Sequence, residues 1–156
     1  MRPSLILIVT GLAFSAPAFA QDWGSDYNMG SIGVLGGSQA NGTIMVDCAE
    51  AGNPVVPKGS LAIFLKPAHR ADIGAESPGG LTFSVDGADV VLPVSDNKGD
   101  GFVFDKTPET LADVTTLIDL LKSGQELLVT AGDTDIARIP LDGAAAALDG
   151  VEACLV

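Results

Sequence analysis

Only two cysteines occur in the 156-residue sequence, Cys48 and Cys154. Cys48 ends a run of β-forming residues, and Cys154 follows an alanine-rich segment far along the chain. A bond between them would close a loop of about 100 residues and stabilise the fold by ~4–5 kcal/mol through the loss of chain entropy. That is a large share of the ~5–15 kcal/mol net stability of a typical domain. Whether the bond forms depends on the compartment, because cytosolic thiols stay reduced.

The first 20 residues have the features of a secretory signal peptide. Arg2 gives a positive start, residues 5–14 form a short apolar stretch, and Ala18-Phe19-Ala20 is a small-x-small cleavage site. The apolar stretch is too short for a membrane span, although an uncleaved anchor helix is the alternative. We therefore predict a protein that is periplasmic, in a Gram-negative cell, or secreted, with no transmembrane span after cleavage. In that oxidising compartment the two cysteines are expected to pair, with two buried free thiols as the alternative.

The acidic balance of the chain limits its partners. The formal net charge is −12, and the acidic residues are spread along the sequence. Such a chain repels nucleic acid and anionic lipid head groups, so we expect no nucleic-acid partner. A cationic partner is allowed but not implied. The length that remains after the signal peptide is that of one domain.

The pattern of short apolar runs and glycine-rich turns predicts a mainly β fold. Residues 21–42 are rich in glycine and serine and are expected to be a flexible N-terminal segment, and residues 43–156 a single β-rich domain. Asp86-Gly87 and Gly132-Asp133 are typical of hairpin turns, and residues 95–101 are expected to be a loop. Strands are expected at 43–48, 60–66, 81–85, 88–94, 102–104, 126–131 and 135–139, with a weak strand at 31–35 in the N-terminal segment.

Two helices complete the predicted fold. Thr107 can cap the first, Pro108 suits its first position, and Gly124 suits its end. Its apolar stripe consists of Leu111, Val114, Leu117, Ile118 and Leu121. Asp142 is expected to cap a second, alanine-rich helix that carries Cys154. The expected class is α+β: an antiparallel β-sandwich or barrel-like sheet with one amphipathic helix and a disulfide-docked C-terminal helix.

These features together resemble a known group of exported proteins. The features are Cys48 at the end of an early strand, Phe83-Ser84-Val85-Asp86-Gly87, and Ile139-Pro140-Leu141-Asp142-Gly143-Ala144 before a helix with Cys154. The chain resembles the invasion-associated locus B family and the similar type VI secretion accessory proteins of Gram-negative periplasms. The similarity covers residues 127–154 and Cys48, and Pro140 and the glycine-rich N-terminus depart from it. It implies a compact β domain with a docked helix, and little about activity.

Signatures of catalysis are sparse. His69 is the sole histidine, so a zinc-binding histidine cluster is excluded. A Ser-His-Asp triad around His69, with Ser60 or Ser77, lacks the G-x-S-x-G turn, and a solvated histidine is the preferred interpretation. Residues 96–101 are similar to the first half of a calcium loop, but Lys98 occupies a ligand position, so a hairpin turn is preferred. We expect no cofactor and no bound metal.

Three residues near the start are candidates for contact with a partner: Trp23, Tyr27 and Met29. Aromatic and methionine side chains are enriched at interfaces, although a tethered N-terminal strand would explain them equally well. We therefore predict an exported, non-catalytic interaction or accessory protein, not an enzyme, whose partner is a protein of the cell envelope.

Two other functions remain open at this point. One is a small-ligand-binding β domain with a cavity lined by Phe64, Phe83 and Phe104. The other is a carboxylate-dependent hydrolase that uses a pair among the 20 acidic residues.

Overall fold

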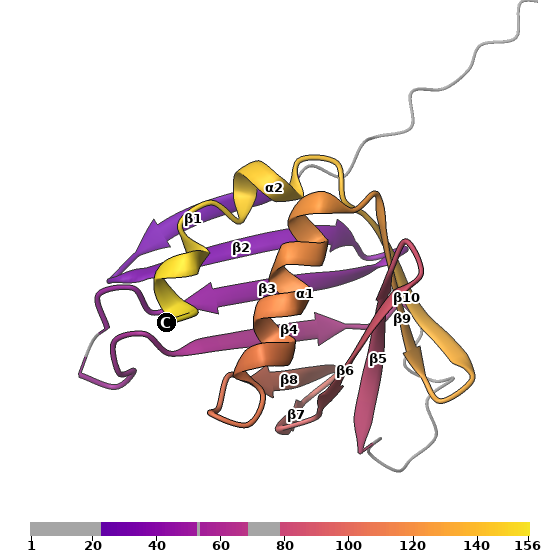
Figure 1. The fold of residues 1–156 in the computed structure, drawn as a ribbon, viewed down its shortest axis with the longest axis horizontal. Helices are drawn as coiled ribbons and strands as arrows, with labels where there is room; N and C mark the ends of the chain where they lie inside the picture. Colours follow the sequence, from indigo (N-terminus) through magenta and orange to yellow (C-terminus); the bar gives the residue numbers. More distant parts are fainter. Residues whose placement is uncertain (1–22, 53, 69–78) are drawn as a thin grey trace, which may run out of the picture.

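The computed structural model describes residues 23–52, 54–68 and 79–156, which form two antiparallel sheets with two helices and a 3₁₀ turn (Figure 1). The six-stranded sheet has the order β1-β2-β3-β4-β8-β7, and the four-stranded sheet has the order β10-β9-β5-β6. This confirms the predicted mainly β, sandwich-like fold. The first sheet contains β1 (Gly24–Asn28), β2 (Ser31–Ser38), β3 (Gly42–Cys48), β4 (Leu61–Lys66), β7 (Asp96–Lys98) and β8 (Gly101–Asp105). The second contains β5 (Gly80–Val85), β6 (Ala88–Pro93), β9 (Glu126–Ala131) and β10 (Thr134–Pro140).

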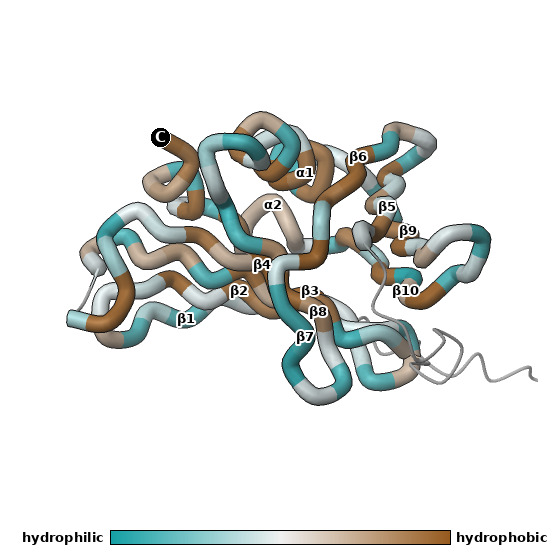
Figure 2. The backbone as a smooth tube through the Cα atoms, turned by 90° about the horizontal axis from the view of Figure 1, so that it is seen from below, coloured by the Kyte–Doolittle hydropathy of each residue, from teal (hydrophilic) through white to brown (hydrophobic). Residues whose placement is uncertain are grey.

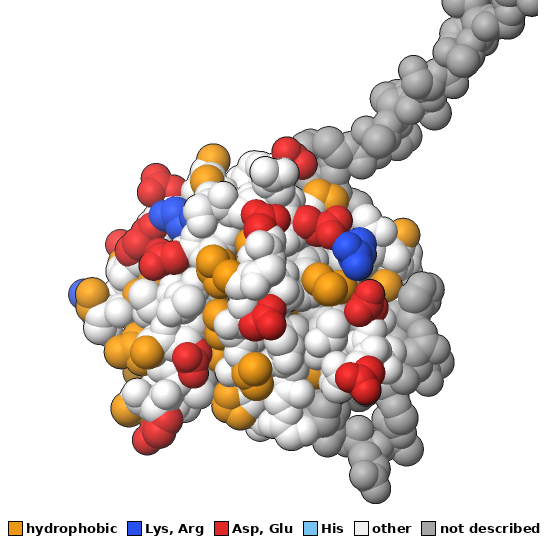
Figure 3. All heavy atoms as spheres, turned by 45° about the vertical axis from the view of Figure 1, so that its right-hand side comes forward, with side chains coloured by type: hydrophobic (Ala, Val, Ile, Leu, Met, Phe, Trp, Pro, Cys, Tyr) orange, Lys and Arg blue, Asp and Glu red, His pale blue; other side chains and the backbone are white. Residues whose placement is uncertain are grey.

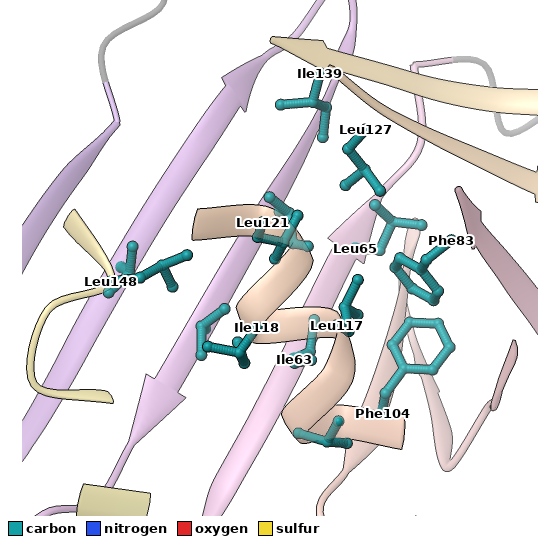
Figure 4. Close-up of a cluster of buried hydrophobic side chains, with 14 of the residues drawn as sticks. Ile63, Leu65, Phe83, Phe104, Leu117, Ile118, Leu121, Leu127, Ile139 and Leu148 are labelled. Carbon is teal, nitrogen blue, oxygen red and sulfur yellow. The ribbon is translucent and has the colours of Figure 1, made fainter. Parts of the chain in front are cut away.

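The core lies between the sheets and helix α1 (Leu111–Ser123), which crosses the six-stranded sheet in Figure 1. The predicted apolar stripe is confirmed for its four buried members: Val114, Leu117, Ile118 and Leu121. Figure 4 shows the stripe among side chains from both sheets and from the C-terminal segment. Phe83 of β5 and Phe104 of β8 meet edge to face, with ring centroids 5.1 Å apart, and so join the two sheets.

Helix α1 begins one turn later than the sequence predicts. Thr110, not Thr107, is its N-cap residue. The two threonines bond to each other: the Thr107 N–H donates to Thr110 Oγ1 (2.9 Å) and the Thr110 N–H donates to Thr107 Oγ1 (3.3 Å). These bonds stabilise a separate turn before the helix. Gly124 ends α1 as predicted, and a Cβ there would lie 2.1 Å from Val85 Cγ1, so only glycine fits.

The C-terminal segment is divided at Gly150, the residue at which the sequence allows the regular helix to end. It consists of a short helix α2 (Ala144–Ala147) and a 3₁₀ turn η2 (Val151–Cys154). Gly143, not Asp142, occupies the N-cap of α2, and Gly150 (φ +91°) interrupts the segment because its backbone is left-handed. The predicted disulfide is confirmed: Cys48 of β3 is bonded to Cys154 of η2, with the Cα atoms 5.8 Å apart.

The N-terminal segment 21–42, expected to be flexible with a weak strand at 31–35, instead contains β1 and a longer strand β2. The reason lies in contacts far away in sequence. Trp23 is buried, and its indole N–H donates to the carbonyl oxygen of Pro140 over 2.8 Å. The ring lies directly on Gly36 of β2, where a Cβ would be 2.3 Å from the indole. Glycine at this position permits close packing against the Trp23 ring. The high glycine content of the segment had instead suggested a flexible chain.

The predicted turns at Asp86-Gly87 and Gly132-Asp133 connect β5 to β6 and β9 to β10, which confirms both hairpins. Residues 95–101 were expected to be a loop, but residues 96–98 of this stretch form the edge strand β7. Pairing with β8 creates that strand, because Asp96 and Lys98 lie opposite Val103 and Gly101. The local sequence, rich in turn formers, gave no sign of it.

Candidate binding surface

The six-stranded sheet has an inner and an outer face, and the helices of the described residues cover only the inner one. Ile44 and Val46 of β3 point inward and are fully buried. In Figure 2, α1, α2 and the C-terminal turn all lie on this inner side of the sheet. Because side chains alternate along a strand, the residues between the buried ones point to the outer face.

Four apolar residues from four neighbouring strands stand side by side on the outer face. We call them the apolar row: Leu35, Met45, Phe64 and Val103. Each is the direct partner of the next across the sheet, so with strands about 4.8 Å apart the row is ~14 Å long. Leu35 is 53% exposed and Met45 36%, whereas Phe64 is half-buried and Val103 buried. The row is therefore an apolar strip that is partly open to solvent.

Acidic residues form a second line beside the apolar row. We call it the acidic row: Asp26, Asp47 and Asp105. Its members lie opposite the small residues Gly33 and Ala62 on the intervening strands. They are two residues along their strands from the apolar row, a distance of ~7 Å. Three carboxylates thus border one side of the apolar row.

The other side of the apolar row carries lysines. We call this the basic pair: Lys66 of β4 and Lys98 of β7. Lys66 forms an ion pair with Asp100 (Nζ to Oδ2, 2.5 Å), and both side chains are more than half exposed. The outer face therefore changes from acidic through apolar to mixed charge along the strand direction.

The surface is hollowed on both sides of Phe64. A hollow of ≈ 510 Å³ lies towards the acidic row, lined by Phe64, Ala62, both Asp47 and Asp105, and residues 55–57. A smaller hollow of ≈ 240 Å³ lies towards the basic pair. Concave, partly apolar surfaces with a few polar groups are typical of binding sites.

Comparison with known families gives one result. The family model YfjT matches residues 21–148. The chain belongs to the YfjT family. No curated protein and no solved structure is similar enough to count as a match. The YfjT match includes the apolar row, the acidic row and the basic pair, and nothing in it bears on the resemblance to the invasion-associated locus B family.

The three residues predicted to contact a partner do not form one exposed patch in this YfjT-family chain. Trp23 is buried in the core, whereas Tyr27 is 57% exposed and Met29 81%. Tyr27 lies opposite Ile32, on the inner side of the sheet at its β1 edge. The apolar row was not predicted, although Met45 and Phe64 alternate with buried neighbours. Their shared line across the sheet depends on strand register, which the sequence does not reveal.

The cavity proposed for a small ligand is not formed by the three phenylalanines. Phe83 and Phe104 pack against each other in the core, whereas Phe64 lies on the outer face. Among the described residues, no group of three His, Cys, Asp or Glu side chains could hold a metal ion. His69 and Ser77, considered for a catalytic triad, lie outside the described residues. Acidic side chains are scattered over the face that Figure 3 shows.

Polar contacts hold the C-terminal segment beside the larger hollow of this YfjT-family fold. Lys106 lines the hollow, and its ammonium donates to the carbonyl oxygens of Gly59 (2.8 Å) and Cys154 (2.5 Å). Lys122 of α1 forms an ion pair with Glu152 of η2. The hydrogen bond between them lowers the pKa of Glu152 and raises that of Lys122.

Within the described ranges, no helix is long and apolar enough to cross a membrane.

Proposed function

We propose that this protein is an exported, non-catalytic interaction module of the cell envelope, periplasmic or secreted, that binds a partner protein through its outer face. The apolar row carries the proposal. Soluble domains seldom leave neighbouring large apolar side chains open on one sheet face unless a partner covers them. Here Leu35, Met45 and Phe64 are direct cross-strand neighbours on a hollowed surface.

Two further observations support export. The first 20 residues read as a signal peptide, and the Cys48–Cys154 bond needs an oxidising compartment to persist. The resemblance to periplasmic accessory proteins agrees with this location. Together they favour a partner in the envelope over one in the cytosol.

In-cell crosslinking tests the proposal. A photoreactive benzophenone residue is placed at Met45 in one variant and at Val91 in another. Val91 is a matched control because it is an exposed apolar residue (59%) in β6, on the other sheet. We expect a protein adduct from position 45 that co-expressed wild-type protein competes away, and none from position 91. Equal adducts at both positions, or a protein retained in the cytosol on fractionation, would refute the proposal.

A carboxylate-dependent hydrolase is a second candidate, favoured by one observation. Asp47 and Asp105 both line the larger hollow, with Ala62 of the intervening strand between them. Their Cα atoms are thus ~10 Å apart, and glycosidases use carboxyl pairs separated by about 5–9.5 Å. Turnover of glycoside substrates that is lost in both Asp47→Asn and Asp105→Asn would establish this activity. Absence of turnover in the wild type would leave the interaction module as the explanation.

A further inference from the structure

The order of the rows on the outer face points to one kind of partner. We infer that the occupant is a cationic amphipathic helix of another protein, which lies along the apolar row with its basic flank over the acidic row. This inference rests on the proposed function, since it names the partner class for the same surface. It is argued from the spacing of the row, the charge on each side of it and the shape of the larger hollow.

The spacing of the apolar row fits a helix better than an extended chain. The four side chains come from adjacent strands and repeat every ~4.8 Å along a line that crosses the sheet. A helix presents apolar residues on one face about every 5.4 Å, one per turn. An extended chain presents them about every 6.8 Å, at alternate residues. Because Val103 is buried, the accessible part of the row is Leu35, Met45 and Phe64. This part is ~10 Å long, and a helix of about seven residues spans it with one apolar contact per strand.

Charge then determines which flank of the helix faces which row. The acidic row lies ~7 Å from the apolar row, within reach of lysine or arginine on the flank of a helix about 10–12 Å wide. The basic pair borders the opposite side, and Lys66 is already paired with Asp100. That side is therefore mixed in charge, because Asp100 and Asp96 lie near the two lysines. The acidic row presents three carboxylates, so a basic flank is favoured over the acidic row.

The larger hollow suits the side chains that such a flank would carry. Its lining combines apolar Phe64, Val55 and Val56 with two carboxylates, Asp47 and Asp105. Lys106 also lines it, but its ammonium donates to two backbone carbonyl oxygens, and the two carboxylates outnumber this one cation. Lysine and arginine bury an apolar stem while the charged end stays near polar groups. An aromatic face adds a cation–π contact within about 6 Å. Apolar stems and cationic ends therefore both find partners there.

Other occupants fit less well. Nucleic acid and anionic membranes would meet the acidic row and the net charge of −12. A second copy of the chain would bring two faces together on which the acidic row outnumbers the basic pair. A cationic protein segment gains from both the local row and the charge of the whole molecule.

Designed peptides test the inference on the full mature protein. Three fluorescent helical peptides of about 18 residues are compared. The first has a leucine stripe with a lysine flank, the second has the same stripe with a glutamate flank, and the third has the lysines with a scrambled stripe. Fluorescence anisotropy at low salt should show binding of the first, with at least tenfold weaker binding of the other two. Affinity for the first should fall in ~0.5 M salt, where charges are screened.

Matched variants separate local from overall charge. Asp47→Asn/Asp105→Asn removes two carboxylates from the acidic row, and we expect about tenfold weaker binding of the lysine-flanked peptide. Asp113→Asn/Asp119→Asn removes the same charge from exposed positions on α1, and should leave the affinity within about twofold. Thermal melting of both variants confirms that they fold. Equal losses in the two variants would overturn the inference, since the acidic row would then have no special role.

The remaining outcomes are also decisive. Equal affinity for the lysine- and glutamate-flanked peptides, or no binding of the lysine-flanked peptide at ~1 mM, would overturn the inference. If position 45 nevertheless crosslinks a protein in cells, the proposed function is supported and only the inference of a cationic helix as the partner is refuted. If the peptide binds but position 45 gives no specific adduct, the proposed function falls and the peptide preference remains.

Discussion

Removal of the Cys48–Cys154 bond should cost a large part of the stability. Both cysteines are fully buried, and the bond fastens η2 to the end of β3 across a sequence separation of 106. Opening a loop of that length gives the unfolded chain conformational entropy that amounts to about 5 kcal/mol at 25 °C. The double variant Cys48→Ala/Cys154→Ala is the direct perturbation.

The expected shift in melting temperature follows from the size of the fold. Unfolding entropy is about 2.1 cal/mol/K per residue, so in a domain of roughly 130 residues each kcal/mol moves the melting temperature by ~3–4 °C. The double variant should therefore melt ~15–20 °C lower. Scanning calorimetry measures the shift, and wild-type protein in strong reductant is the companion sample because it opens the bond without removing a sulfur atom.

A buried truncation in the same turn serves as the control. Val151→Ala removes two methyl groups from η2 and leaves the disulfide intact, so it should cost ~2 kcal/mol by the loss of packing alone. Loss of the disulfide should lower the melting temperature clearly more than Val151→Ala does. A drop below ~5 °C in both the double variant and the reduced wild type would refute the entropic reasoning.

Three further predictions concern contacts around the core. Gly36→Ala should push the Trp23 ring out of its place, with a red-shifted tryptophan emission and a loss of ~1–3 kcal/mol. Lys106→Met leaves two carbonyl oxygens without their donor and should lower the free energy of unfolding by ~2 kcal/mol in urea titrations. The bond from Lys122 lowers the pKa of Glu152, so this carboxylate stabilises the fold above its ordinary pKa of 4.5 and loses that effect as pH falls. Glu152→Gln should therefore flatten the acid side of the profile of melting temperature against pH.

Each of these predictions has a control and a contradicting outcome. Gly33→Ala is the control in β2, because the nearest atom to a Cβ there is 3.9 Å away, and unchanged emission in both glycine variants would contradict the Trp23 argument. Lys98→Met removes the same charge from an exposed site, and an equal loss would show that only charge mattered. If Glu152→Gln has the same melting temperature as the wild type at every acid pH, the ion pair with Lys122 is not the cause of the loss of stability in acid.

Strong alternation of apolar residues made most of the strands predictable. Ile44 and Val46 in β3, and Leu81 and Phe83 in β5, alternate with less buried neighbours, and this period of two has only one regular explanation. The disulfide was predictable because the first 20 residues predict export, and two cysteines in an oxidising compartment are expected to pair.

The errors came from contacts that the local sequence does not contain. β1 and β2 are rich in glycine, and the contact that anchors them joins Trp23 to Pro140 across 117 positions. The start of α1 was placed one turn early because Thr107 and Thr110 are equivalent caps until their mutual hydrogen bonds are known.

The candidate surface was not predictable for a related reason. Leu35, Met45 and Phe64 each read as ordinary strand residues, since alternation does not say which face of a strand is covered. Their line across the sheet requires the register of three strand pairs, and that register is a tertiary property. Of the contact residues predicted near the start, Trp23 is buried, because an aromatic side chain beside a glycine-rich strand can anchor that strand as well as contact a partner.

The sulfur bridge between β3 and η2 also determines the timing of assembly. Cys48 is synthesised early, but Cys154 is synthesised 106 residues later, after all the described strands. The early hairpins must therefore persist without their final fastening, and the slow step should be oxidation rather than strand pairing. A thiol oxidant or isomerase that meets the finished chain would then control how fast the mature molecule accumulates.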